Sequence, residues 1–147
     1  MRRVSLIDSQ WNPDGDIGAF GRAVSDKAGA IASFIGKVRG GGVEALELKH
    51  YPAMTLRGME DLADTVSARW SLDGLLIMHR VGVMYPGEAI VAVSAAAPHR
   101  RAAFEAVDFA MDYLKSAAWF WKREKTAGGW QWIEPRAQDH EDLARWT

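Results

Sequence analysis

The chain has 147 residues, of which 48% are hydrophobic and 25% charged, a composition that is typical of one globular domain over residues 1–147 and excludes a disordered or fibrous chain. The 18 Lys and Arg against 19 Asp and Glu give a net charge of −1, which predicts no general attraction to nucleic acid or to a membrane surface. The chain has no cysteine, which excludes disulfides, thiolate metal sites and cysteine nucleophiles.

The elements of the N-terminal half follow from apolar spacing and turn residues. In chain order, the sequence predicts a loop-like opening that includes the turn residues Asn12–Asp16, a helix from about Asp16 to Val24, a buried strand over Gly29–Val38, a strand over Val43–Tyr51 and a helix from Thr55 to Trp70. Asp16 and Thr55 are the expected N-caps. The glycine-rich loop Gly40–Gly42 between the two strands predicts a β-hairpin.

The C-terminal half continues the alternation of strands and helices. It predicts strands over Leu75–Val81 and Ala89–Ala97, a helix from Pro98 to between Trp119 and Glu124, a short strand over Trp130–Ile133 and a closing helix over Asp139–Trp146. Pro98 suits the first helical position. Paired strands with helices between the pairs predict an α+β fold with a largely antiparallel sheet.

Targeting and membrane signals are missing from these residues. No stretch reaches the roughly 18–20 consecutive apolar residues of a membrane helix. The apolar stretch Val4–Ile7 is too short for a secretion signal. We therefore expect a cytoplasmic protein without a membrane partner.

Two lysines are candidates for chemistry. Lys115 and Lys122 are seven residues apart, so a helix through both would place them on one face at about 10 Å. Lys115 lies beside the apolar stripe of its helix, and desolvation lowers the pKa of a lysine and makes it a candidate base or nucleophile. From spacing alone, two lysines whose stems cover the core are the simpler interpretation.

Cations also gather locally in this near-neutral chain. Residues 98–125 carry six positive and four negative side chains, and the positive ones are Arg100, Arg101, Lys115, Lys122, Arg123 and Lys125. Arg100 follows His99 at the start of a predicted helix, where free N–H groups bind anions. Lys37 and Arg39 precede glycines that let a backbone approach a ligand. These clusters would suit a phosphate-bearing ligand, although a solvated helix face and a plain hairpin turn remain open.

Other catalytic patterns are weak. The four histidines lie far apart, without carboxylates at ligand spacing, so no metal site is expected. No GxSxG motif is present. The aromatic run Trp119–Trp121 could stack on a flat heterocycle, but such runs more often belong to a core or an interface.

Seven motifs in order make the sequence resemble the family of large, catalytic subunits of molybdopterin synthase. They are Phe34–Arg39, His50–Met54, His79–Gly82 with Pro86–Glu88, His99–Arg100, Ala103–Ala106, Met111–Lys115 and Phe120–Glu124. The resemblance extends from about residue 29 to residue 146 and is weak over residues 1–28. The loop Gly40–Gly42 is shorter than the polar loop that the family has there.

The resemblance implies an α/β-hammerhead fold with an added antiparallel subdomain. It implies a sulfurtransferase of molybdenum cofactor biosynthesis. The enzyme would move sulfur from the C-terminal thiocarboxylate of a small ubiquitin-like subunit to cyclic pyranopterin monophosphate, forming the dithiolene of molybdopterin. It also implies a homodimer that binds two small subunits as a heterotetramer, with no metal or other cofactor.

The resemblance implies roles for individual residues as well. Lys115 and Lys122 would be catalytic. The substrate pocket would be lined by Lys37, Val38, Arg39, His99, Arg100, Lys115, Lys122, Arg123 and Glu124.

Three other functions remain open on the residues alone. Aromatic side chains beside Lys and Arg are also typical of a module that binds a phosphorylated heterocycle or single-stranded RNA. Lys115 or Lys122 could form a Schiff base with a carbonyl substrate. The tryptophan-rich surface could serve only as the interface of a structural subunit.

Overall fold

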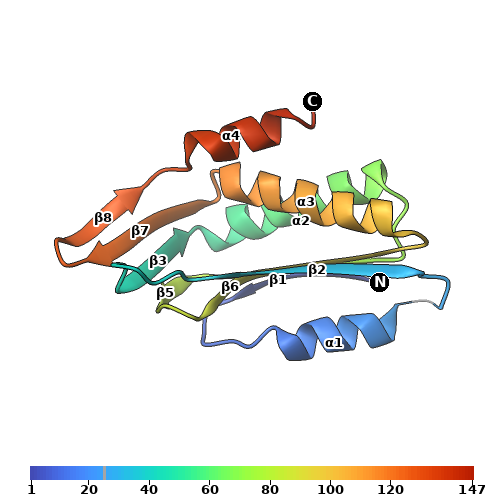
Figure 1. The fold of residues 1–147 in the computed structure, drawn as a ribbon, viewed down its shortest axis with the longest axis horizontal. Coiled ribbons are helices and arrows are strands. Elements are labelled where there is room, and N and C mark those ends of the chain that lie inside the picture. Colours follow the sequence, from blue (N-terminus) through green and yellow to red (C-terminus); the bar gives the residue numbers. More distant parts are fainter. Residues whose placement is uncertain (25) are drawn as a thin grey trace.

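The structure, a computed structural model, describes residues 1–24 and 26–147 and has an α+β fold, as predicted. Figure 1 shows its elements. In chain order they are β1 (Arg2–Ile7), α1 (Asp14–Ala23), β2 (Ala30–Lys37), β3 (Ala45–His50), α2 (Pro52–Arg69), β4 (Gly74–Arg80), β5 (Gly82–Met84), β6 (Ala89–Ala97), α3 (Arg100–Ser116), β7 (Phe120–Thr126), β8 (Gly129–Ile133) and α4 (Ala137–Ala144).

The first sheet has the strand order β1-β4-β6-β2, in which only β1 and β4 run parallel. Helices α2 and α3 cover one face and α1 covers the other (Figure 1). Side chains of a strand alternate between the two faces, so Leu75 and Ile77 of β4 pack under α2 and α3, whereas Leu76 and Met78 pack on α1. This double cover explains why every residue of β4 is buried.

The second sheet has the order β5-β3-β7-β8 and is antiparallel throughout. It lies at one end of the first sheet, at the left of Figure 1. Its inner face packs Leu46, Leu48 and Met84 with Val38 into a separate small core. From β8 the chain turns back, and α4 packs against α3.

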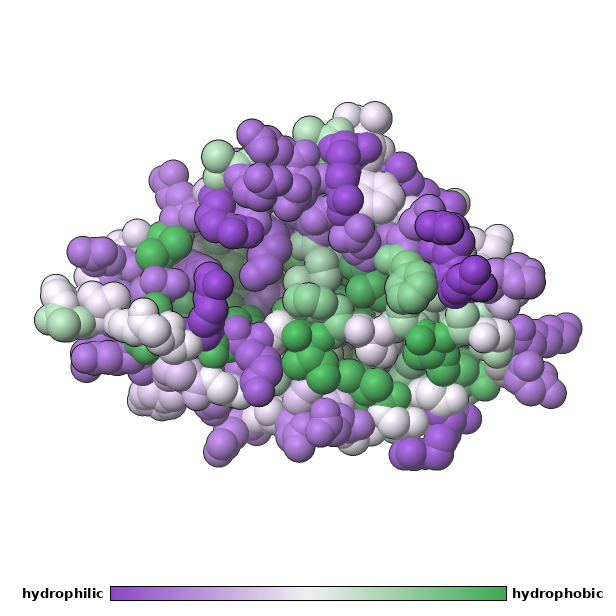
Figure 2. Space-filling view, viewed as in Figure 1, coloured by the Kyte–Doolittle hydropathy of each residue, from purple (hydrophilic) through white to green (hydrophobic). Residues whose placement is uncertain are grey.

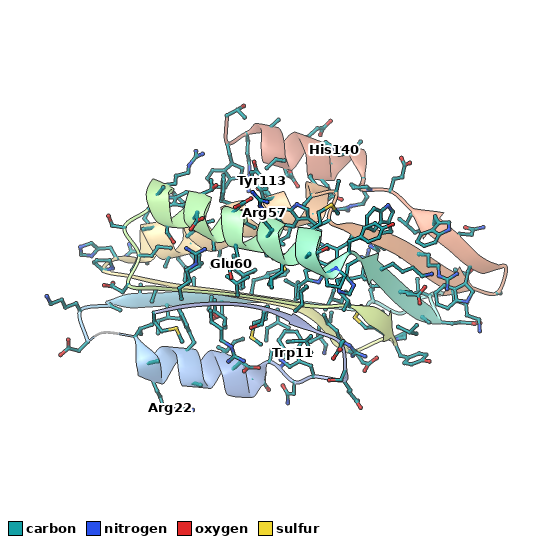
Figure 3. The ribbon with its side chains drawn as sticks, turned by 180° about the vertical axis from the view of Figure 1, so that it is seen from behind. Trp11, Arg22, Arg57, Glu60, Tyr113 and His140 are labelled. Atoms are coloured by element: carbon teal, nitrogen blue, oxygen red, sulfur yellow. The ribbon has the colours of Figure 1, made fainter. Side chains whose placement is uncertain are left out.

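Residues 2–7 form a strand, so the loop-like opening predicted for the N-terminus is wrong there. β1 pairs with β4 from Arg2 opposite Leu75 onward. The two arginines that interrupt its apolar pattern are held by carboxylates of neighbouring helices. Arg2 bonds to Glu60 of α2 at 2.9 Å, labelled in Figure 3, and Arg3 bonds to Asp16 of α1 at 2.8 Å.

The predicted β-hairpin over residues 29–51 is also wrong. β2 is the edge strand of the first sheet and pairs with β6, whereas β3 belongs to the second sheet. The glycine loop adopts positive φ at Gly41 and Gly42 and leads the chain to the second sheet instead of reversing it. Because β2 is an edge strand, it is not buried as predicted, and Ile31, Phe34 and Ile35 are exposed.

Helix α3 ends earlier than predicted, at Ser116. Ala117 is extended, and the chain then enters β7 at Phe120. Trp119 lies between them, against Gly58 of α2, and its carbonyl accepts a hydrogen bond from Thr55 at 2.7 Å. Thr55 therefore lies inside α2, which begins at Pro52 with Tyr51 as its N-cap, and its hydroxyl bonds to Trp119 instead of capping the helix.

The other helix starts differ from the prediction by one to three residues. Pro13 is the N-cap of α1 in place of Asp16, and His99 is the N-cap of α3, one residue after Pro98. The short strand β5, which the sequence did not predict, pairs only with β3 among the described residues. Across these same residues, no helix has both the length and the apolar character that crossing a bilayer requires.

Candidate functional site

A cavity of about 550 Å³ opens between the end of α3, the inner face of the second sheet and the segment between β8 and α4. A wider hollow of about 940 Å³ adjoins it along β2 and the glycine loop. Both are lined by the same six residues, which are Arg39, Leu46, Ile90, Lys115, Lys122 and Glu124. In Figure 2 the surface is hollowed on the left side, between hydrophilic side chains.

The two candidate lysines meet here from different elements. Lys115 lies in the last turn of α3, and Lys122 lies on β7, so they do not share a helix as the spacing suggested. Alternation along β7 places Phe120, Lys122 and Glu124 on the face that lines the cavity. Both lysines therefore reach the same space.

The charge of Lys115 depends on its surroundings. Its side chain opens onto the cavity, but protein atoms crowd it, and this desolvation lowers its pKa below the ordinary lysine value. The positive charge of Lys122 lowers the pKa further, and Arg136 and Arg39 act in the same direction. Asp139 opposes them. The neutral amine is therefore reached at lower pH than for a lysine in water.

Asp139 and Arg136 form a wall of the cavity that the sequence analysis did not predict. Burial alone would raise the pKa of Asp139, but hydrogen bonds from Arg136 outweigh this and hold that pKa below its usual range. The backbone N–H of Arg136 donates to Asp139 Oδ2, and its Nη2 donates to Oδ1, both at 3.0 Å. Ser116 Oγ donates to the Asp139 carbonyl at 3.0 Å, which fastens the start of α4 to the end of α3.

His79 forms part of the cavity floor and is a further residue that the sequence did not assign to the site. It is buried, and its ring stacks on Phe120 with centroids 4.1 Å apart. Burial lowers the pKa of His79 to about 4, and the nearby charge of Lys115 acts in the same direction. The imidazole is therefore neutral near pH 7. Its only signal in the sequence is its place in the motif His79–Gly82.

The start of the glycine loop supplies three more of the predicted residues. Lys37 and Arg39 are exposed, and Val38 between them is buried. Val38 donates its N–H to the Glu88 carbonyl at 2.9 Å and accepts from the Gly87 N–H at 2.8 Å. These bonds hold the backbone of this segment, so that Lys37 and Val38 line the wider hollow and Arg39 lines both spaces.

Arg123 lies on the opposite face of the sheet from the cavity. Its Nε donates to Glu47 Oε1 at 2.5 Å, and its guanidinium lies 4.4 Å from the ring centroid of Trp130. Arg123 therefore stabilises the outer face of β7, while its neighbours Lys122 and Glu124 point from the inner face into the cavity. Residues 120–126 form a strand and not the predicted helix. Because side chains alternate between the two faces of a strand, Arg123 points away from the cavity.

His99 and Arg100 are also separated from the cavity within one chain. They begin α3, and Lys115 ends it, so 15 helical steps of about 1.5 Å put roughly 22 Å between the two ends. Neither residue lines either space. The predicted cationic cluster is therefore divided between the two ends of α3.

Comparisons with known proteins agree on one family. The family model described as "MoaE protein" matches residues 12–117. The "Molybdopterin synthase catalytic subunit" of Caulobacter vibrioides is 48% identical, over 97% of this chain and 96% of its own length.

Solved structures give the same result. The "Molybdopterin biosynthesis MoaE protein from Burkholderia ambifaria MC40-6" is 39% identical with a TM-score of 0.82, covering 99% of this chain and 98% of its own. A complex of subunits 1 and 2 of molybdopterin-converting factor from Helicobacter pylori 26695 has a chain that shares the fold, at 18% identity and a TM-score of 0.77, covering 90% of this chain and 91% of its own. With the family model matching most of its residues and a relative that is almost half identical along nearly its whole length, this chain belongs to the MoaE protein family.

Proposed function

We propose that this chain is the catalytic subunit of a molybdopterin synthase, a sulfurtransferase of molybdenum cofactor biosynthesis. It transfers sulfur from the C-terminal thiocarboxylate of a small ubiquitin-like subunit to cyclic pyranopterin monophosphate and so forms the dithiolene of molybdopterin. The names of its relatives support this activity. The observation that carries the proposal is the meeting of Lys115 and Lys122 on one cavity. We also propose that the protein is cytoplasmic, as expected from its sequence.

The two lysines suit the chemistry of a thiocarboxylate. The thiocarboxylate sulfur first bonds to a carbon of the substrate. Water then adds to the carbonyl carbon, and the tetrahedral oxyanion collapses to leave the sulfur on the substrate and a carboxylate on the small subunit. Two ammonium groups beside that carbon stabilise the negative charge of the oxyanion. Lys115 has the second property that the reaction needs. Because its pKa is lowered, it can take up and return a proton during opening of the substrate ring.

The substrate carries a phosphate, and the cavity offers cations to hold it. Arg39 lines both spaces, and Lys37 lines the wider hollow. A guanidinium binds phosphate oxygens in a bidentate geometry, which orients the ligand as well as attracting it. The stacked pair His79 and Phe120 gives the cavity a flat wall suited to a heterocycle.

A homodimer explains how His99 and Arg100 reach a substrate cavity although they lie at the far end of α3 within one chain. A surface of exposed apolar side chains extends along β2 and α3, seen as the green area in Figure 2, and includes Ile31, Phe34, Ile35 and Phe104. Phe34 and Ile35 line the wider hollow at one end of this surface, and Phe104 lies near the start of α3 at the other. In a contact with twofold symmetry, the end near Phe34 in one copy lies against the end near Phe104 in the other copy, and the reverse. The second copy thus brings its His99 and Arg100 toward the cavity, and each copy binds one small subunit.

Reconstitution tests the function. The protein is mixed with a thiocarboxylated small subunit and cyclic pyranopterin monophosphate, and molybdopterin is assayed as its oxidised fluorescent derivative. We expect product from the wild type and none from Lys122→Ala. Lys125→Ala is the matched control, because Lys125 lies on the same strand with its exposed side chain on the opposite face. Normal turnover by Lys122→Ala would contradict the assigned site, and no product from the wild type with a bound small subunit would contradict the reaction.

A further inference from the structure

His79 has a defined orientation at the base of the cavity. It follows Leu75 and Ile77 on the face of β4 that packs under α2 and α3. The end of α3 passes over it, and Leu114 and Lys115 line the same cavity. Stacking on Phe120 fixes the plane of the ring. The imidazole is therefore held in a fixed plane where it lines the cavity.

The tautomer of His79 follows from its backbone contact. Nδ1 lies 2.9 Å from the carbonyl oxygen of Arg80, and a carbonyl oxygen only accepts, so Nδ1 carries the proton and donates. The carbonyl belongs to a residue that is itself fixed, because Arg80 bonds to Glu88 at 2.8 Å and to the Val83 carbonyl at 3.1 Å. In a neutral ring with a protonated Nδ1, Nε2 is an acceptor.

An acceptor and a donor are left without partners on this cavity. Among the described residues, Nε2 of His79 has no hydrogen bond, and it is not one of the atoms sealed from solvent. Among the same residues, the ammonium of Lys115 has no hydrogen-bond partner either. The carboxylate of Asp139, which also lines the cavity, already receives bonds from Arg136 on both oxygens.

We propose that His79 is a positioning residue for Lys115: a rotation of the lysine side chain, which makes no hydrogen bond among the described residues, lets Nζ donate to Nε2 of the imidazole. This deepens the proposed function and rests on it. An ammonium has three N–H donors, so one bond to His79 aims the group and leaves two for the substrate. A neutral acceptor orients the cation without cancelling its charge, as a carboxylate would. The stacked ring thus acts as a rigid support for one of the two lysines.

Two amide variants separate this role from a structural one. His79→Gln keeps an acceptor near the position of Nε2 and loses the bond to the Arg80 carbonyl, whereas His79→Asn keeps a donor near Nδ1 and loses Nε2. In the reconstituted reaction we expect the Asn variant to lose roughly 10- to 100-fold in kcat, the range for one hydrogen bond to a charged group, and the Gln variant to lose clearly less. The Kd for the small subunit should be unchanged in both. The opposite ranking, or equal losses, would overturn the proposal.

A spectroscopic test is independent of turnover. In ¹⁵N-histidine NMR spectra of the wild type from pH 5 to 8, with His79 assigned from the Gln variant, we expect a neutral ring protonated on Nδ1. Lys115→Met should shift the Nε2 resonance, and Lys125→Met should leave it in place. An Nε2-protonated ring, or an Nε2 chemical shift that does not change in Lys115→Met, would overturn the inference. An inactive wild type that passes this test would instead contradict the proposed function and leave the contact between His79 and Lys115 standing.

Discussion

Lys115 and Lys122 line one cavity although the first ends helix α3 and the second lies on strand β7. The chain between them makes the turn that brings them together. Trp119 packs against Gly58 and accepts a hydrogen bond from Thr55 of α2, and this anchors the start of β7. The spacing of seven residues is therefore not a helical period but the length of a helix end, a tight connection and the first residues of a strand.

The proximity of the two lysines predicts a measurable coupling. Lys122→Gln removes a positive charge that lowers the pKa of Lys115, so the pKa of Lys115 should rise toward the ordinary value of 10.5 while remaining below it because of desolvation. Titration of ¹³C-labelled lysines by NMR measures this directly. Lys49→Gln, on the outer face of the second sheet, is the control. A midpoint for Lys115 that stays or falls in Lys122→Gln would contradict the coupling.

The same shift sets the sign of a stability change. A lysine whose pKa is lower in the folded protein binds fewer protons there than in the unfolded chain, in the window between its folded pKa and 10.5. Stability therefore rises with pH across that window. Lys115→Met removes this dependence, so its free energy of unfolding should change less with pH above neutrality than that of the wild type. Urea unfolding at several pH values tests it, and identical slopes for both proteins would contradict it.

Gly58 leaves room for Trp119, which predicts a strong effect from a small substitution. A Cβ at position 58 would overlap the indole of Trp119, so Gly58→Ala must displace the anchor of β7. We expect a loss of about 1–3 kcal/mol in stability, as for overpacked cores, together with reduced turnover because Lys122 follows on that strand. Gly15→Ala is the matched control, since it meets nothing within 4 Å and should gain about 0.5 kcal/mol from helix propensity. Urea unfolding compares the two, and equal stabilities would contradict the role of Gly58.

The sequence predicts local features of this fold well and the contacts between distant segments poorly. Ala89–Ala97 is found with its predicted bounds, because a run of small and β-branched residues between turn signals leaves few alternatives. β1 was missed because Arg2 and Arg3 find their partners in Asp16 of α1 and in carboxylates of α2, and no local pattern shows those ion pairs. The hairpin prediction failed for the same reason, since the choice between β3 and β6 as partner of β2 is made by the whole sheet.

The site shows the same limit. Arg39, Lys115 and Lys122 line one cavity, although α3 ends at Ser116 and does not continue to Lys122. Asp139 and His79 escaped notice because each acts through a tertiary contact, to α3 and to β7 respectively. A lone histidine in an apolar strand gives no sign of which ring nitrogen will face a cavity.

Glu88 supports the base of the cavity through Arg80. The Arg80 side chain is 7% exposed and its Nη1 bonds to Glu88 Oε1, while its Nε is buried without a partner among the described residues. Glu88→Ala leaves this cation unpaired, and we expect a loss of about 3 kcal/mol in stability. Glu141→Ala on the exposed side of α4 should have little effect. Chemical denaturation measures both, and a Glu88→Ala protein as stable as the wild type would contradict the pair's importance.

That ion pair also sets a pH dependence. The hydrogen bond from Arg80 lowers the pKa of Glu88, so its contribution to stability is complete above the unfolded value near 4.5 and is lost as pH falls through the lower folded pKa. The stability of Glu88→Ala should therefore decline less steeply with acid than that of the wild type. Parallel declines between pH 5 and 3 would contradict this.

The division of the cationic residues between the two ends of α3 gives the sharpest test of the homodimer. If each cavity takes Lys122 from one copy and Arg100 from the other, Lys122→Ala and Arg100→Ala proteins should each be inactive or strongly impaired alone. A mixed dimer of the two has one cavity with both defects and one with neither, so unfolding and refolding them together should restore activity, up to one intact site per mixed dimer. Phe104→Asp on the exposed apolar surface should prevent both dimerisation, seen by light scattering, and this recovery. Mixing without recovery, while mixed dimers form, would show that each cavity is built from one chain alone.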